Sequence, residues 1–94
     1  MTYRVLLKKN ASKQFASLSE KDQKRVLASL NELRVHPYAG KKLHGDLQGL
    51  WSIRVWPYRI IYTVEKKIVT VTVVSIGDRK NIYKKLKSYC SKCG

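Results

Sequence analysis

The stretch from residue 50 to 64 constrains the fold most, because apolar residues recur at every second position on both sides of a short turn. A period of two is typical of β-strands, and Trp56 and Pro57 fall where a proline costs no ladder hydrogen bond. Arg54 and Arg59 interrupt these strands, and a charged side chain there needs water, a partner or a ligand. The face predicted to point into the core carries Trp51, Ile53, Val55, Ile60, Tyr62 and Val64.

The residues before this hairpin predict one strand and two helices. Residues 2–8 alternate as a strand does, whereas residues 10–18 have their apolar side chains at steps of four and three, as in a helix. Ser19 is a candidate N-cap for a second helix, with Asp22 in the matching capping-box position. This helix should end near Val35, because a proline two residues later disfavours helical backbone before it. Its predicted apolar stripe consists of Val26, Leu27, Leu30 and Leu33.

The remaining residues complete an α+β pattern. Residues 37–49 read as a loop, residues 68–76 as a β-branched strand, and residues 78–87 as a short helix. A strand, two helices and three successive strands predict an N-terminal strand and helical hairpin packed on a mainly antiparallel four-stranded sheet, followed by the short C-terminal helix. With no linker or repeat, residues 1–94 are expected to form one domain.

The charge balance predicts a polyanionic partner. Twenty Lys and Arg residues stand against six Asp and Glu, which gives a net charge of +14. Nucleic acid is the leading candidate, followed by an acidic protein and by an anionic membrane surface. The sequence has no apolar run of the ~20 residues that a membrane span needs, and its start lacks the apolar core of a signal peptide. We therefore expect a cytoplasmic protein with no membrane contact.

The cysteines and histidines are weak signals. Cys90 and Cys93 form a C-x-x-C pair that could supply half of a zinc site or a redox disulfide, but a plain terminal segment is the simpler interpretation. Two histidines could exchange protons in a nuclease. His36 precedes a proline at a helix end, where exposure or capping is expected, whereas His44 lies just before the hairpin and could approach RNA.

Four side chains could converge at one end of the sheet. Arg54 and Arg59 flank a tight turn, and Arg79 and Tyr83 follow the last strand at helical spacing. Guanidinium groups bind phosphate oxygens through planar forks, and a phenol ring can stack on a base. A solvated basic face is the alternative interpretation, and spacing alone does not decide between them.

Three segments together resemble the RelE/ParE superfamily of type II toxins: residues 43–55, 58–62 and 76–83. The order of elements also agrees over nearly the whole chain. The resemblance implies a small antiparallel-sheet domain with a helical hairpin. It also implies a RelE-like mRNA interferase that contacts mRNA and ribosomal RNA in the ribosomal A site, inhibits translation and is inhibited by a cognate antitoxin.

The resemblance also implies roles for individual residues. Arg54, Arg59, Arg79 and Tyr83 match the catalytic positions, whereas Ser52 stands where well-known members have a lysine proposed as a proton acceptor. The implied reaction is attack by a ribose 2′-OH on the adjacent phosphate, which needs no metal and no cofactor. Further residues expected to contact RNA are Ser52, Trp56, Lys80, Lys84, Lys85 and His44.

Two other functions remain open at this point. A ParE-like toxin would inhibit DNA gyrase by binding and would not need the RNA-cutting residues. A basic RNA-binding module would bind without catalysis. Cleavage of translated mRNA separates the first function from both of these.

Overall fold

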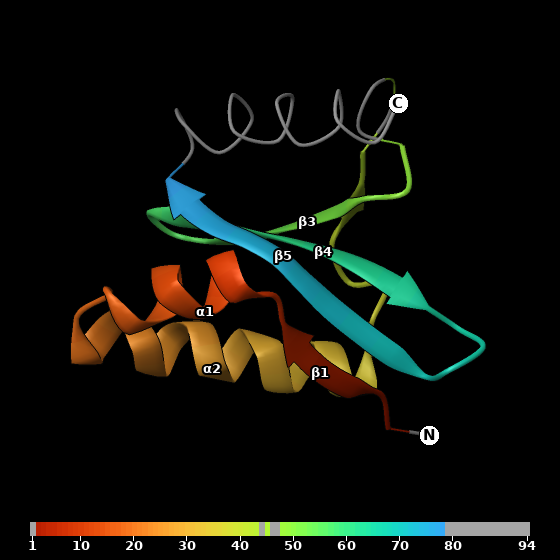
Figure 1. The fold of residues 1–94 in the computed structure, drawn as a ribbon, viewed down its shortest axis with the longest axis horizontal. Helices are drawn as coiled ribbons and strands as arrows, with labels where there is room; N and C mark the ends of the chain where they lie inside the picture. Colours follow the sequence, from red (N-terminus) through yellow and green to blue (C-terminus); the bar gives the residue numbers. More distant parts are fainter. Residues whose placement is uncertain (1, 44, 46–47, 79–94) are drawn as a thin grey trace.

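A computed structural model describes residues 2–43, 45 and 48–78 of the chain (Figure 1). The elements follow in the order β1 (Arg4–Leu7), α1 (Lys9–Ala16), α2 (Glu20–Val35), β2 (Lys41–Lys42), β3 (Trp51–Val55), β4 (Tyr58–Glu65) and β5 (Thr70–Asp78). The predicted strands and helices within this range are confirmed to within a few residues. The predicted C-terminal helix lies outside the described residues.

The sheet differs from the prediction, because it is mixed and has five strands in the order β1-β5-β4-β3-β2. The expectation of a mainly antiparallel four-stranded sheet is therefore wrong. The fifth strand, β2, has only two residues, both lysines, so alternation could not reveal it. Strand β1 pairs in parallel with β5, with Arg4 beside Thr70. The helical hairpin and strands β2 to β4 separate β1 from β5 in the sequence, which gives the long connection that a parallel pair needs.

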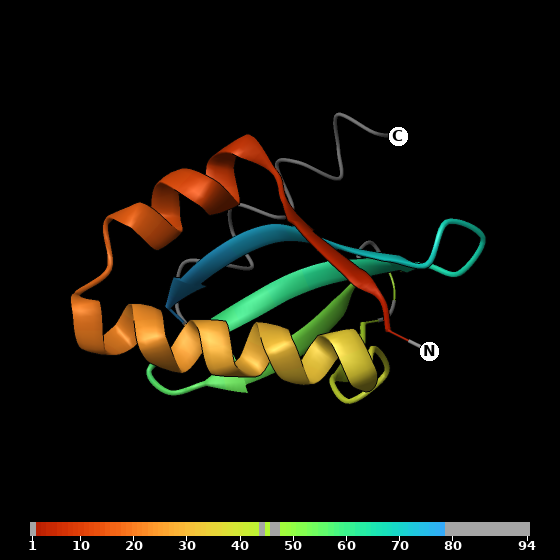
Figure 2. The same cartoon turned by 90° about the horizontal axis from the view of Figure 1, so that it is seen from below.

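Helices α1 and α2 form a hairpin that covers one face of the sheet (Figures 1 and 2). The predicted N-cap is confirmed, because Ser19 Oγ accepts a hydrogen bond of 3.2 Å from the backbone N–H of Asp22. Gln23 Nε2 donates a hydrogen bond of 3.0 Å to the carbonyl oxygen of Phe15, so a side chain of α2 provides a partner for a carbonyl group in the last turn of α1. The predicted stripe of α2 is wrong at Leu27, which is 49% exposed.

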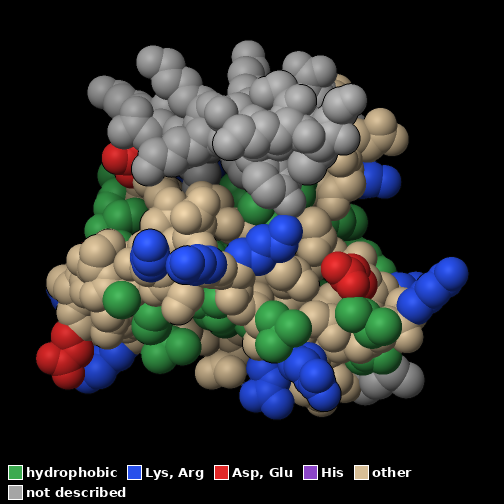
Figure 3. Space-filling model, viewed as in Figure 1, with side chains coloured by type: hydrophobic (Ala, Val, Ile, Leu, Met, Phe, Trp, Pro, Cys, Tyr) green, Lys and Arg blue, Asp and Glu red, His purple; other side chains and the backbone are tan. Residues whose placement is uncertain are grey.

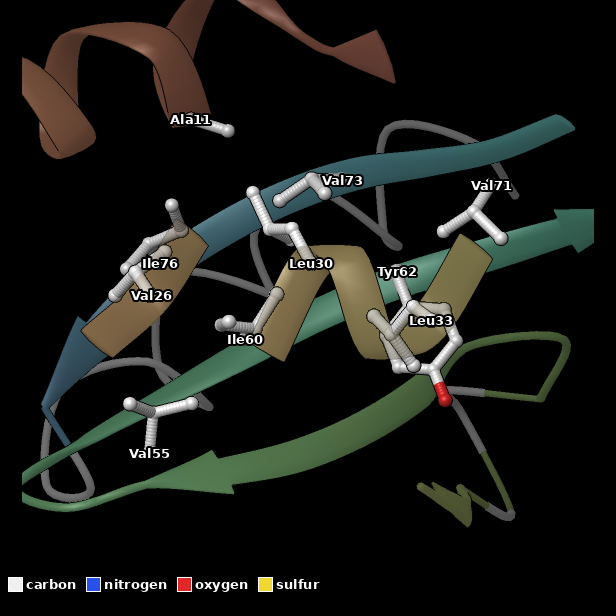
Figure 4. Packing of buried hydrophobic residues seen from close by; sticks show 10 residues of the cluster. All are labelled: Ala11, Val26, Leu30, Leu33, Val55, Ile60, Tyr62, Val71, Val73 and Ile76. Atoms are coloured by element: carbon white, nitrogen blue, oxygen red, sulfur yellow. The ribbon is translucent and has the colours of Figure 1, made fainter. Parts of the chain in front are cut away.

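The core lies between the helices and the sheet (Figure 4). Tyr62 is fully buried, and its hydroxyl accepts a hydrogen bond of 3.1 Å from the backbone N–H of Gly40. This bond gives the buried phenol the partner that it needs. The core cluster consists of Ala11, Val26, Leu30, Leu33, Val55, Ile60, Tyr62, Val71, Val73 and Ile76.

Strand β5 contains a β-bulge. Ile61 pairs with Ser75 whereas Tyr62 pairs with Val73, which leaves Val74 as an extra residue. Gln14 of α1 holds this point, because its Oε1 accepts hydrogen bonds from the backbone N–H of Ile76 at 2.8 Å and from Ser75 Oγ at 3.3 Å. Helix α1 therefore fixes the register of the sheet at the bulge.

Candidate nucleic-acid interface

Arg54 and Arg59 lie directly opposite each other on β3 and β4. Directly opposed residues of an antiparallel pair project from the same face, with Cβ atoms roughly 4.5–5.5 Å apart. The helices cover the other face, to which Ile60 and Tyr62 contribute core side chains. The two arginine side chains therefore leave the strands side by side, on the face opposite the helices.

The burial of these two arginines differs. Arg54 is exposed, whereas Arg59 is partly buried and its Nε atom is buried. Like charges directly opposite each other destabilise a sheet, and burial strengthens electrostatic interactions. An anion placed between the two side chains would reverse this repulsion. A phosphate suits the pair chemically, because each planar guanidinium can donate two parallel hydrogen bonds.

The strand on the other side of Arg59 adds no side chain at this position. Gly77 of β5 is its register partner. Arg59 is therefore flanked by a guanidinium on one side and by a glycine on the other. This arrangement leaves the partly buried arginine with no β5 side chain at its register position.

The turn between the two arginines is attached to α2. Tyr58 Oη donates a hydrogen bond of 3.0 Å to Asp22 Oδ2. This bond, together with burial and the negative charges of Asp22 and Asp78, raises the pKa of Tyr58 above its usual value. Since Tyr58 immediately precedes Arg59, the bond fixes the start of β4 against the helical layer.

Ser52 and Trp56 occupy contrasting environments. Ser52 is 3% exposed, and its buried Oγ makes no hydrogen bond to the described part of the chain. Trp56, at the turn, is 65% exposed. The ring of Trp56 is therefore accessible to a base, whereas Ser52 offers little surface, and RNA contact by either residue stays a prediction.

The other predicted site residues lie outside the described residues, so their convergence with the arginine pair stays a prediction. They are Arg79, Lys80, Tyr83, Lys84, Lys85 and His44. His36 is described: it is exposed and follows α2 as its C-cap, with its backbone N–H donating to the carbonyl of Glu32 at 2.8 Å. Its predicted place at a helix end is confirmed.

The sequence did not predict where β2 lies. Lys41 pairs with Ser52, and Lys42 pairs with Trp51, so the two lysines project from opposite faces of the sheet. Lys41 therefore shares the face of Arg54. Two adjacent lysines in a loop carry no strand signal, so only the register reveals this placement.

Close packing holds β2 in place. A Cβ atom added at Gly40 would lie 2.5 Å from the carbonyl oxygen of Ser52 and 2.6 Å from Tyr62 Oη. Only glycine permits this approach, because real Cβ contacts are essentially never so short. Trp51 packs against the core, as predicted, and its ring centroid lies 5.2 Å from that of Tyr38. The backbone before β2 thus sits directly on β3.

No group of three or more His, Cys, Asp or Glu side chains could hold a metal ion among residues 2–43, 45 and 48–78. Over the same part of the chain, no helix is long and apolar enough to cross a membrane. Lysine and arginine side chains outnumber acidic ones on the face shown in Figure 3.

Comparison with known proteins identifies the family. The model of a family described as the ParE toxin of the type II toxin-antitoxin system parDE matches residues 5–83. The chain belongs to this family of toxins. It is thus a type II toxin of the RelE/ParE superfamily, as the sequence resemblance indicated. No curated protein matches the chain.

Solved structures support the RelE-like branch of this superfamily. The toxin is similar to a chain of the archaeal RelE-RelB complex from Pyrococcus horikoshii, with 30% identity and a TM-score of 0.74 over 85% of this chain and 98% of that one. The toxin-antitoxin complex RelBE2 from Mycobacterium tuberculosis gives 25% identity and a TM-score of 0.78, covering 84% of this toxin and 100% of that chain. The toxin is also similar to a chain of the intact E. coli RelBE toxin-antitoxin complex, with 25% identity and a TM-score of 0.74. This match covers 83% of this toxin and 98% of that chain.

Proposed function

We propose that this toxin is a ribosome-dependent mRNA endonuclease that acts in the cytoplasm and needs no metal. The observation that carries the proposal is the directly opposed pair Arg54 and Arg59 on the face opposite the helices. Two guanidinium groups on the same face of adjacent strands can donate hydrogen bonds to the oxygens of one phosphate, which favours a polyanionic ligand. The RelE proteins among the structural neighbours support the same branch of the superfamily.

The proposed reaction is internal transfer at a phosphodiester. The ribose 2′-oxygen attacks the adjacent phosphorus, its P–O bond forms, and the bond to the 5′-oxygen of the next nucleotide breaks. The 2′-OH loses a proton and the leaving 5′-oxygen gains one, which leaves a 2′,3′-cyclic phosphate and a 5′-hydroxyl. No oxidant or metal is required for this balance.

The chain's residues would act mainly through charge and position. Arg54 and Arg59 would hold the phosphate and stabilise the additional negative charge of the transition state. Neither can serve as the acid, because the pKa of arginine lies above about 12. Arg79 would stabilise the leaving oxygen, and Tyr83 would stack on a base or assist a proton transfer. The other residues proposed to contact RNA are Ser52, Trp56, Lys80, Lys84, Lys85 and His44.

Cleavage of mRNA during translation in vitro tests this function. Wild-type toxin should cut mRNA when ribosomes are present. Arg59→Ala should abolish cleavage, whereas Arg25→Ala, which removes an exposed arginine from α2, should leave it intact. Full cleavage by Arg59→Ala would overturn the assignment, as would cutting that requires no ribosome.

Inhibition of DNA gyrase is the second candidate, because the matching family model is described as the ParE toxin of parDE. In that case the toxin would produce gyrase-dependent DNA breaks and leave translated mRNA uncut. Supercoiling by purified gyrase, measured beside the translation assay, separates the two activities. RNA binding without either effect would indicate a non-catalytic module.

A cognate antitoxin is the proposed protein partner. Chains similar to this toxin occur in RelBE and RelE-RelB complexes. Strand β1 is an edge of the sheet, and a groove of about 520 Å³ runs between it and α2, with Arg4 and Arg34 in its lining. An acidic, amphipathic antitoxin segment fits this groove by charge and could pair with the edge strand.

Co-expression with the neighbouring reading frame tests the partner. The antitoxin should relieve toxicity and co-purify with the toxin. The double change Arg4→Glu and Arg34→Glu should weaken the complex more than the same change at Lys66 and Lys67, in the turn after β4. Toxicity unchanged by every adjacent gene would exclude an adjacent-gene antitoxin.

A further inference from the structure

We propose that Lys41 of β2 is a third phosphate-binding residue of the arginine site, an inference that rests on the proposed RNA-directed function. The register supplies the geometry. Lys41 lies opposite Ser52, Ser52 and Arg54 are two positions apart on β3, and Arg54 lies opposite Arg59. Residues two apart on a strand share a face. Three adjacent strands therefore each contribute one cation to the same face.

Lys41 is close enough to act with the arginines. It is a diagonal neighbour of Arg54, a relation that separates positions by roughly 7–8 Å and is within reach of long side chains. The ammonium of an exposed lysine moves on a flexible four-carbon stem. It can therefore contact the phosphate held by the arginines or the next phosphate along the strand.

The residue between the two cations along this face is small. Ser52 is short and 3% exposed, so no long side chain stands between Lys41 and Arg54 along this row. A larger residue there would separate the ammonium from the guanidinium groups. The row thus combines two exposed cations with a small buried residue between them.

The backbone at Lys41 is fixed in spite of the short strand. The N–H of Gly40 donates to Tyr62 Oη at 3.1 Å, and the N–H of Leu43 donates to the carbonyl of Leu50 at 2.9 Å. These bonds flank β2 on both sides and anchor it to the core and to the start of β3. A positioned cation loses less entropy on binding a ligand than one on a free loop.

Lys42 provides a matched control. It is the next residue, it is also exposed, and it carries the same charge. Its partner is Trp51, whose side chain packs against the core, so Lys42 projects from the helix-covered face. Loss of net charge alone would affect both lysines equally. Loss of a phosphate contact would affect Lys41 only.

The experiment compares Lys41→Ala, Lys42→Ala and Lys41→Arg in two assays. The first assay measures kcat/KM for mRNA cleavage on translating ribosomes. The second measures the affinity of a short single-stranded RNA by fluorescence anisotropy over a series of salt concentrations. Circular dichroism and thermal unfolding establish that all three variants fold.

We expect Lys41→Ala to lose about tenfold or more in kcat/KM, the effect of one charge-assisted hydrogen bond. Its salt slope for RNA affinity should fall by about 0.7, the value of one phosphate contact on a single strand. Lys42→Ala should change kcat/KM less than about twofold, below the effect of an ordinary hydrogen bond. Lys41→Arg should retain both properties.

Equal effects of the two alanine variants would overturn the role of Lys41, even if the wild-type toxin cleaves mRNA as proposed. If the wild-type toxin does not cleave mRNA, the proposed function fails. The salt slopes would still decide the RNA contact of Lys41, and equal slopes would exclude it. The two failures are therefore distinguishable.

Discussion

Substitution of Gly40 by alanine should destabilise the toxin through a defined steric conflict. The new methyl group would lie 2.5 Å from the carbonyl oxygen of Ser52 and 2.6 Å from Tyr62 Oη. The first contact is with backbone, so β2 must move away from β3. Overpacking of this kind typically costs about 1–3 kcal/mol. Movement would also break the 3.1 Å bond from Gly40 N–H to Tyr62 Oη, worth about 0.5–1.5 kcal/mol.

Together these terms predict a loss of about 1.5–4.5 kcal/mol in the free energy of unfolding. Urea denaturation monitored by tryptophan fluorescence measures this loss, because Trp51 packs against the core beside the displaced strand. Tyr62→Phe is the control that removes the hydrogen bond without adding a methyl group, and it should cost about 1 kcal/mol. Gly40→Ala within about 0.5 kcal/mol of wild type, the range of neutral surface changes, would refute the reasoning.

Three further predictions concern single side chains on the sheet. Arg54→Thr should raise the free energy of unfolding by about 0.5 kcal/mol, because it removes a like charge opposite Arg59. The same change should reduce mRNA cleavage. A variant less stable in urea than wild type would contradict the expected gain in stability. Tyr58→Phe should lose less stability than wild type as the pH rises above 10. Because the pKa of Tyr58 is raised in the folded protein, its phenol stabilises the fold while it is neutral, and the wild type loses this contribution when the phenol ionises. Parallel curves of stability against pH for the two proteins would contradict this prediction. Val69→Gly should increase the melting temperature by an amount equivalent to about 1 kcal/mol, because relief of the strain of a β-branched residue at φ 50° should exceed the entropic cost of a glycine in the unfolded chain. An unchanged or lower melting temperature would contradict this balance.

Local sequence signals predicted the elements well. The hairpin, the N-cap at Ser19 and the end of α2 at Val35 all depend on residues close together in the chain. The buried state of Tyr62 also followed from its position in an alternating strand. Each of these features is determined by backbone propensity or by a period of two or 3.6.

Features that depend on distant residues were not predicted. The parallel pairing of β1 with β5 joins Arg4 to Thr70 and has no local signature. Strand β2 exists because Gly40 permits close approach to β3, which a sequence pattern does not reveal. Leu27 has the spacing of a core residue but lines the groove beside β1 and stays half exposed. At the candidate site, the sequence predicted that Arg54 and Arg59 lie close together on adjacent strands, but it did not predict that Lys41 lies on the same face.

The β-bulge explains how the same strand serves the core and the arginine site. Without the extra residue Val74, the register at Tyr62 would continue along β5 and place Ile76 opposite Arg59. The bulge shifts the pairing by one residue, so that Ile76 enters the core and Gly77 lies beside the arginine. Because Gln14 accepts the hydrogen bond from Ile76 N–H, a polar contact from α1 maintains this arrangement. The helical hairpin thereby determines which side chains surround Arg59 on the opposite face of the sheet.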